Sequence, residues 1–280
     1  MKTKNTITLL FLIISLSILS SCTEKINLKL NESNTRLVVE GNISTDSIEQ
    51  MVTLTQSTSY FYNQSAPTIK SASVTVSDGA NSYSYSEQPI GSGKYFTDKK
   101  FAGKQGANYH LTISGVDINN DGTNEIYHAT EKMKNYLIID SIYALKVSMF
   151  GRKGYRIFGF AQEPATPGDF YMWRYYINNK LITDTLGKIT FSSDQLGNGN
   201  YLSNFEMGFI EEGEAGDILM VETNAITEDY FNYIISFFLE TQWSGGGFSG
   251  PPANIKTNID NGALGYFNTS ARSYISAILP

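Results

Sequence analysis

The residues with the clearest chemistry lie near the start of the chain. Leu19–Cys22 reads Leu-Ser-Ser-Cys, a lipobox in which a branched apolar residue and two small residues precede a cysteine that becomes diacylated before cleavage. Ahead of it, two lysines and the apolar run Ile7–Leu19 form a secretory signal, shorter than the roughly 20 residues needed to cross a bilayer. We therefore expect a lipoprotein signal peptide over residues 1–21 and a lipid anchor on Cys22, with palmitate as an acyl chain. The competing interpretations are an ordinary cleaved signal and a tail held by its own helix.

A polar segment in the first half of the chain has the spacing of a calcium loop. Asp117, Asn119 and Asp121 stand at positions 1, 3 and 5, and Gly122 stands at position 6. Position 12 is His128 in place of the bidentate glutamate, and strand patterns flank the segment. We favour a polar hairpin turn. Calcium stays the alternative, and we expect no other cofactor.

The residues that commonly carry acid–base or nucleophilic catalysis are scarce. The chain has two histidines, His110 and His128, each on the polar side of a strand pattern and without a supporting Asp/Ser or Glu/His spacing. The acidic run Glu211–Asp217 is typical of a solvated turn, and Gly245–Gly247 lacks the lysine of a phosphate loop. Cys22 is the only cysteine, so lipidation leaves no thiol for a disulfide, a metal or a nucleophile. We therefore expect no catalytic residues and no enzyme.

Two groups of aromatic residues are candidates for contact with a ligand or a partner. One is Tyr60, Phe61 and Tyr62, and the other is Trp243 with Phe248. Aromatic residues in β proteins usually belong to the core, whereas exposed ones stack on sugars or contact partner proteins. Between the two groups we favour the second, because the segment that follows Trp243 is rich in glycine and proline and is expected to form a loop.

Composition favours a secreted β protein. Removal of the 21-residue signal from the 280 residues leaves a chain long enough for one large domain or two ordinary ones. Aromatic residues make up 13% of the chain and charged residues 17%, and β strands favour aromatic and β-branched side chains. The net charge of −6 argues against a nucleic acid as a partner, because its phosphate backbone attracts basic surfaces.

Short strand patterns fill residues 35–135. About seven of them in roughly 100 residues, separated by turn signals, is the spacing of an immunoglobulin-like or fibronectin-like β-sandwich. We therefore expect an immunoglobulin-like domain over residues 35–135, joined to the lipid by a tether at residues 22–34. The clearest alternating runs are Leu37–Ile43, Met51–Gln56, Ser71–Ser77, Ala107–Val116 and Glu125–Lys132.

Residues 136–280 combine further strands with one change of period. Thr227 is a good N-cap, Glu228 and Asp229 follow in the first turn, and apolar residues then recur at helical spacing up to Trp243. This predicts one helix near residues 228–242 in a larger C-terminal β domain. The expected strands include Leu137–Val147, Tyr155–Phe160, Phe170–Ile177, Phe205–Ile210, Ile218–Thr223 and Ala271–Leu279.

Several of these segments together resemble one protein family. They are the lipobox, the strand Leu37–Gly41, the glycine-led strand entries Gly93–Tyr95 and Gly106–Tyr109, and the C-terminal segment Pro251–Phe267. Over essentially its whole mature length, the chain resembles uncharacterised outer-membrane lipoproteins from Bacteroidota that carry domain of unknown function 4249. The resemblance implies an outer-membrane lipoprotein, often encoded beside a TonB-dependent receptor, that acts as its accessory subunit. It implies no activity and no catalytic residues.

The sequence thus favours a non-catalytic accessory or binding subunit of a TonB-dependent nutrient-uptake receptor. The alternative is a free-standing surface lipoprotein that binds glycans or peptides, and a hydrolase comes third. We expect the protein at the cell outer membrane, held by the lipid on Cys22. Whether it faces the periplasm or the cell surface stays open, because Thr23–Lys25 offers one carboxylate where surface export is marked by several.

Overall fold

The computed structural model describes residues 35–58, 64–149, 151–242 and 255–280. These residues belong to one compact unit, Thr35–Pro280. The signal peptide expected at residues 1–21 and the tether expected at residues 22–34 lie outside the described part of the chain.

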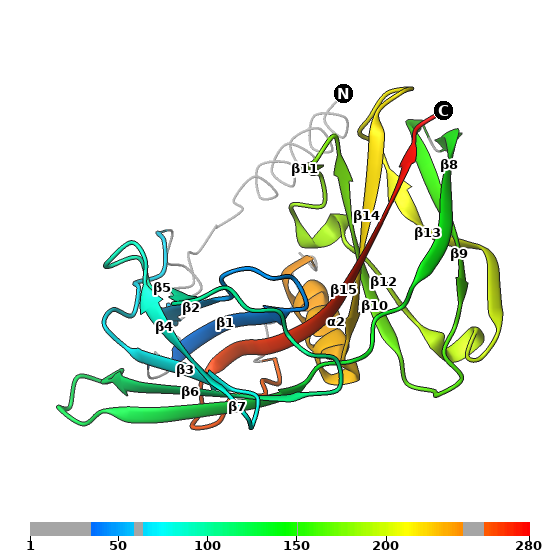
Figure 1. Cartoon of the computed structure of the whole chain (residues 1–280). Coiled ribbons are helices and arrows are strands. Elements are labelled where there is room, and N and C mark those ends of the chain that lie inside the picture. The colour runs from blue at the N-terminus through cyan, green and yellow to red at the C-terminus, as the bar shows by residue number, and fades with distance from the viewer. Residues whose placement is uncertain (1–34, 59–63, 150, 243–254) are drawn as a thin grey trace, which may run out of the picture. The chain divides into compact units, whose positions relative to one another are not determined.

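Strands dominate the described residues, and one α-helix, α2 (Glu228–Gln242), interrupts them (Figure 1). The mainly β class and the packed helix are therefore confirmed. Two short 3-10 turns, η1 (Leu186–Lys188) and η2 (Asp194–Leu196), flank one strand of the second half. The strands are β1 (Leu37–Ser44), β2 (Met51–Gln56), β3 (Ser73–Ser77), β4 (Ser82–Glu87), β5 (Lys94–Thr97), β6 (Asn108–Val116), β7 (Glu125–Lys132), β8 (Ile139–Met149), β9 (Arg152–Gln162), β10 (Phe170–Ile177), β11 (Lys180–Leu181), β12 (Thr190–Ser193), β13 (Tyr201–Ile210), β14 (Ile218–Ile226) and β15 (Leu264–Ile278).

The strands of the described residues form one large sheet and one small one. The large sheet runs in the order β11-β10-β14-β15-β1-β2-β5-β4-β3-β6-β7, and β12 pairs with β10. The small sheet has the order β13-β9-β8. An immunoglobulin-like sandwich consists of two packed sheets, whereas all strands from β1 to β7 are hydrogen-bonded into the one large sheet. The immunoglobulin-like domain therefore stays a prediction.

The last strand, β15, links the two halves of the large sheet. Its first part pairs in parallel with β1, from Leu264 opposite Val38 to Ser270 opposite Ser44. Its second part pairs antiparallel with β14, from Ala271 opposite Ala225 to Ile278 opposite Ile218. Figure 1 shows β15 running from β1 along β14, towards the start of β14. The hydrogen-bonded sheet therefore crosses the boundary that the sequence predicts near residue 135.

Burial follows the alternation that the sequence predicts. In β6, Tyr109, Leu111 and Ile113 are buried, whereas His110 between them is exposed. Successive side chains of a strand point to opposite faces, so one face of β6 faces the core and the other faces solvent. β14 differs, because every residue from Val221 to Ile226 is buried. Such continuous burial is expected of a strand covered on both faces.

Helix α2 begins where the sequence predicts. The Thr227 hydroxyl oxygen accepts a hydrogen bond from the Tyr230 N–H at 3.2 Å, which satisfies one of the donors left free at a helix start. Glu228 and Asp229 occupy the first turn, where the helix dipole favours negative charge. The Thr227 hydroxyl also donates to Glu131 of β7, so the cap fastens the helix to a strand of the first half.

The parallel pairing of β15 with β1 depends on Gly265. Its φ is +88°, and a Cβ at this position would lie 2.0 Å from the Val39 carbonyl oxygen. We expect Gly265→Ala to lower the free energy of unfolding by at least about 3 kcal/mol, because backbone cannot move aside as a flexible side chain can. Gly262→Ala is the matched control: its φ is +73° but no atom lies within 4 Å of the added Cβ.

In the control, the free energy of unfolding should decrease by only about 1–2 kcal/mol, because alanine is strained in the left-handed conformation. Urea denaturation followed by circular dichroism measures both losses. Equal losses in the two variants would show that backbone strain, and not the contact between strands, sets the requirement for glycine at residue 265.

Candidate functional site

Two cavities open beside helix α2, with volumes of about 490 Å³ and about 380 Å³. Tyr233 of α2 and Tyr266 of β15 line both of them, and we call the two cavities together the tyrosine groove. The larger cavity is lined by residues of β1, β2, β15 and α2, and the smaller by α2, by Tyr266 and by residues 255–258. The groove thus combines segments that are far apart in the sequence.

Aromatic rings form the helix side of the groove. Tyr230, Tyr233 and Phe237 are spaced three and four residues apart, which places them on one face of α2. The ring centroid of Tyr266 lies 4.9 Å from that of Tyr233 and 5.1 Å from that of Tyr230. The Phe237 ring lies 6.3 Å from Tyr233 and is 41% exposed. Burial raises the pKa of Tyr230, Tyr233 and Tyr266, so these phenols stay protonated at neutral pH.

Strand β1 supplies polar groups to the opposite side of the larger cavity. Its alternation turns Leu37, Val39 and Ile43 into the core, whereas Glu40 and Asn42 line the cavity. The Asn42 side-chain oxygen accepts hydrogen bonds from Asn268 and Ser270 of β15. The groove therefore presents rings on one side and amide and carboxylate groups on the other.

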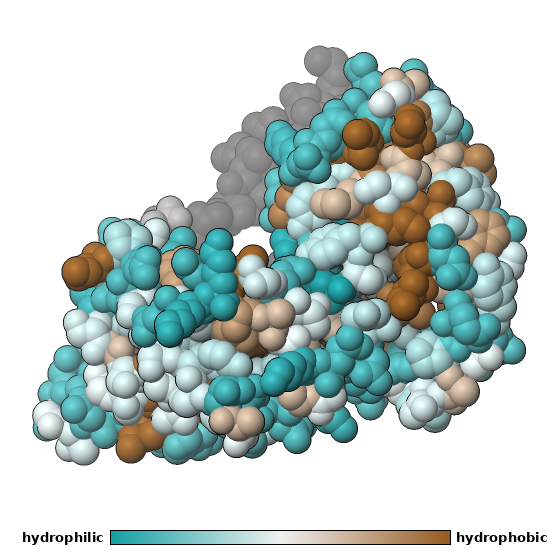
Figure 2. Space-filling model, in the orientation of Figure 1, coloured by the Kyte–Doolittle hydropathy of each residue, from teal (hydrophilic) through white to brown (hydrophobic). Residues whose placement is uncertain are grey.

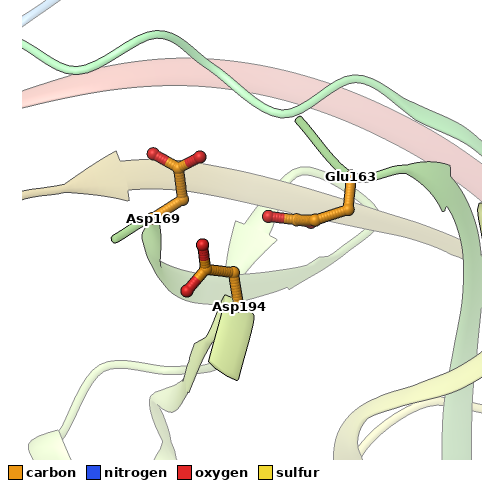
Figure 3. A group of neighbouring side chains, drawn as sticks. All are labelled: Glu163, Asp169 and Asp194. Atoms are coloured by element: carbon orange, nitrogen blue, oxygen red, sulfur yellow. The ribbon is translucent and has the colours of Figure 1, made fainter. Parts of the chain in front are cut away.

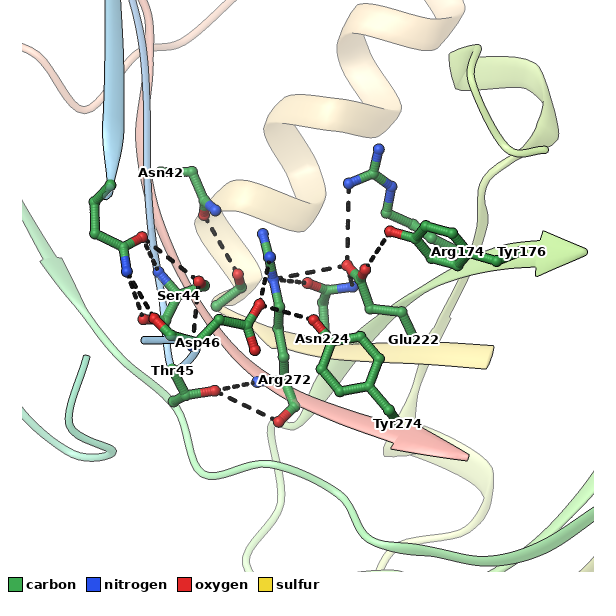
Figure 4. A network of polar contacts seen from close by, with 12 residues as sticks. Asn42, Ser44, Thr45, Asp46, Arg174, Tyr176, Glu222, Asn224, Arg272 and Tyr274 are labelled. Atoms are coloured by element: carbon green, nitrogen blue, oxygen red, sulfur yellow. Dashed lines mark hydrogen bonds and ion pairs between the residues drawn. The ribbon is translucent and has the colours of Figure 1, made fainter. Parts of the chain in front are cut away.

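Arg272 of β15 stands at the edge of the larger cavity, in the polar network of Figure 4. Its Nη1 lies 2.8 Å from Asp46 Oδ2, and its Nε donates to Asn224 Oδ1 at 3.1 Å. The Tyr274 hydroxyl donates to the same Asp46 oxygen at 2.7 Å. Burial acts to lower the pKa of Arg272, but Glu222 and Asp46 raise it overall, so the guanidinium stays charged.

Glu222 of β14 is the buried anion of this network, with a side chain that is 2% exposed. Its Oε1 lies 3.6 Å from Arg272 Nε and 4.0 Å from Arg174 Nη1. The Tyr176 hydroxyl donates to Oε2 at 2.6 Å. Burial, together with this hydrogen bond, raises the pKa of Tyr176 to about 12. Two cations and a phenol thus hold one buried carboxylate, which fixes the edge of the groove.

A second buried carboxylate, Glu131 of β7, holds the helix side of the groove. It accepts hydrogen bonds from the Thr227 hydroxyl, from Asn258 Nδ2 at 3.0 Å and from the Tyr266 hydroxyl at 3.3 Å. Burial raises the pKa of Glu131, although these three donors act to lower it. The position of Tyr266, and with it the floor of the groove, therefore depends on β7.

The side chains of the groove could bind a ligand. Aromatic faces can stack on a sugar ring or on an apolar side chain, and the neighbouring amides, carboxylates and Arg272 can fix the orientation of a ligand by hydrogen bonds.

A family model described as a domain of unknown function (DUF4249) matches residues 23–275. The chain belongs to the DUF4249 family. No match was found among curated proteins.

The aromatic candidates of the sequence lie outside the described part of this DUF4249 protein. They are Tyr60, Phe61, Tyr62, Trp243 and Phe248, and Cys22 lies outside it as well. Their roles therefore stay predictions. None of the helices in the described segments is long and apolar enough to cross a membrane.

The calcium candidate of the sequence is a loop closed by its own hydrogen bonds. The Asp117 carboxylate accepts the N–H groups of Asp121 and Gly122, at 3.1 and 2.9 Å. The Asp121 carboxylate accepts from the Thr123 N–H and from Asn119 Nδ2. These contacts are those of a polar turn between β6 and β7, and calcium at this loop stays a prediction. Elsewhere in the described residues, Glu163, Asp169 and Asp194 form a group that could hold a metal ion.

Sequence reasoning missed the residues that build the tyrosine groove in this DUF4249 protein. Two signals pointed to them. Tyr230, Tyr233 and Phe237 recur at helical spacing within a helix that the sequence predicts, and Arg272 is the single charged residue between Leu264 and Pro280. A charged residue in an otherwise uncharged strand needs a charged partner if it is buried, and Arg272, which is 15% exposed, pairs with Asp46 and Glu222.

Loss of Arg272 should destabilise the fold more than loss of an exposed arginine. We expect Arg272→Ala to lower the free energy of unfolding by about 3 kcal/mol, because Glu222 would stay buried with one cation fewer. Arg152→Ala is the matched control, since Arg152 and its partner Glu211 are both exposed. Thermal unfolding at neutral pH should show a large decrease for the first variant and no change for the second.

The double variant Arg272→Ala with Glu222→Gln should recover part of the loss, because it removes the unpaired charge. An Arg272→Ala variant as stable as the original chain would contradict the network described above.

Proposed function

We propose that this DUF4249 protein is a lipid-anchored, non-catalytic binding subunit that works with a TonB-dependent receptor in nutrient uptake at the outer membrane. The observation that carries the binding role is the tyrosine groove, which has the size of a small-ligand site, aromatic faces and a few fixed polar groups. The receptor partner and the outer-membrane location come from the lipobox and from the family resemblance.

The distance to the membrane supports a partner within the same membrane. Twelve residues separate the proposed lipid site, Cys22, from Thr35, where the described unit begins. A fully extended chain spans at most about 3.5 Å per residue, so these residues reach about 40 Å. A domain held within that distance meets membrane receptors at high local concentration.

The surface of the second half offers apolar contact area for a receptor. Figure 2 shows hydrophobic side chains gathered over the part of the molecule that holds β8, β13 and β15. Exposed large aliphatic residues in or next to the strands of this half include Ile138, Leu145, Ile218 and Ile278. Contiguous exposed apolar surface commonly marks a protein contact.

The second candidate function is a free-standing lipoprotein that binds glycans or peptides. The same groove favours it, because aromatic side chains stack on sugar rings. A hydrolase has less support. The buried carboxylates Glu163 and Asp194 are inaccessible to a substrate, and the described residues of the groove contain no histidine.

The test for a receptor partner is an affinity pull-down of the full-length protein from detergent-solubilised outer membrane. We expect one TonB-dependent receptor in nearly equal amount. Cys22→Ala is the control, because it removes the anchor and should lower the recovery of the receptor. Recovery of the protein alone would reject the accessory role and leave the free-standing binder.

The groove is tested separately with a panel of oligosaccharides and peptides. We expect Tyr233→Ala to weaken binding at least about tenfold, because this residue lines both cavities. Tyr201→Ala is the matched control, since Tyr201 is an exposed tyrosine that lines neither cavity. Equal effects of the two substitutions would exclude the groove as the binding site.

A further inference from the structure

Three acidic side chains converge away from the tyrosine groove, at one end of the second half. Glu163 directly follows β9, Asp169 directly precedes β10, and Asp194 begins η2. Figure 3 shows the three side chains close together, with the Glu163 carboxylate pointing towards the two aspartates. One oxygen from each lies within 4.8 Å of the others. The two ends of the β9–β10 connection and the start of η2 therefore bring one carboxylate each to a common point.

Burial distinguishes this group from an exposed acidic patch. Glu163 is 1% exposed and Asp194 is 6% exposed. Glu163 Oε1 accepts a hydrogen bond from the Tyr171 hydroxyl at 2.8 Å, but Glu163 Oε2 is buried and has no hydrogen-bond partner among the described residues. Buried polar atoms are nearly always paired, because an unpaired one has lost its hydration without compensation. The unpaired Oε2 atom of Glu163 therefore favours a ligand at this group.

The charge of the group leads to the same conclusion. One cation is close, Lys134, whose Nζ lies 3.5 Å from Asp169 Oδ1 and donates to the Gly168 carbonyl oxygen at 2.8 Å. The Gly168 N–H donates to Asp194 Oδ2 at 2.8 Å. When all three carboxylates are ionised, they and the ammonium carry two negative charges in excess. A divalent cation among the carboxylates would neutralise them.

We propose that Glu163, Asp169 and Asp194 bind a calcium ion. Calcium is bound by oxygen ligands at 2.3–2.6 Å, so two oxygens on the same ion lie up to about 5 Å apart, which fits the spacing of this group. Zinc in proteins takes mainly nitrogen and sulfur ligands, and none is in this group. Magnesium keeps several of its waters and binds through one or two carboxylates, which suits a buried group of three less well.

The proposed ion joins three segments that are otherwise connected by turns. It would fix the end of β9, the start of β10 and η2 to one another, and its binding energy would add to the stability of the fold. This site lies on different strands from the Asp117–Glu125 loop, which offers a direct comparison between the two acidic segments.

The test measures calcium binding by the full-length chain, purified in detergent and freed of metal with EDTA. Titration calorimetry with calcium chloride should show one ion per chain, and calcium should raise the melting temperature. We expect Glu163→Gln, which keeps the shape of the side chain, to weaken calcium binding at least tenfold. Asp121→Asn, in the closed loop between β6 and β7, should leave it unchanged.

Three results would overturn the proposal. The first is that millimolar calcium neither binds to the unsubstituted chain nor changes its melting temperature. The second is that Asp121→Asn loses calcium binding while Glu163→Gln keeps it, and the third is that magnesium binds as tightly as calcium. If Glu163→Gln fails to fold, Asp169→Asn replaces it, because the Asp169 side chain is partly exposed. Absence of calcium binding by the unsubstituted chain rejects the proposal in either case.

Discussion

The pairing of β15 with both β1 and β14 is the interaction on which the rest of the structure depends. A strand from the end of the chain pairs in parallel with the first described strand, and then antiparallel with the strand that precedes it in the sequence. Parallel neighbours require a long connection, and here nearly the whole chain is that connection. Formation of this ladder therefore requires both halves to be in place, and Gly265 permits the close approach.

The candidate site follows from the same strand. Tyr266 and Arg272 are six residues apart on β15, an even number, so alternation directs both side chains to the same face of the sheet. One lies on the floor of the tyrosine groove and the other at its edge. α2 brings Tyr230 and Tyr233 to that face, and its cap is fastened to Glu131 of β7. The groove is thus a product of sheet register and helix placement together.

Several carboxylates are buried in this fold, and different groups compensate the burial of each. Glu222 is held by two guanidinium groups and a phenol, and Glu131 by three hydrogen-bond donors. Glu163 has one donor for two oxygens. Burial of a carboxylate is unfavourable unless charge or hydrogen bonds compensate it, so the unequal treatment of these three groups is informative. Glu222 and Glu131 belong to fully paired structural networks, whereas Glu163 keeps an unpaired oxygen that a cation could bind.

The sequence by itself determined the local structure and the family of this protein. Alternation in β6 and the cap at Thr227 depend on neighbours within a few residues, so periodicity and side-chain chemistry were enough to predict them. The register of β15, the tyrosine groove and the meeting of Glu163, Asp169 and Asp194 were decided by the tertiary structure alone. Each joins residues tens to hundreds of positions apart, and no local pattern specifies which distant strands will pair. Long-range pairing depends on how the whole core is buried at once, and a local pattern of residues does not reveal it.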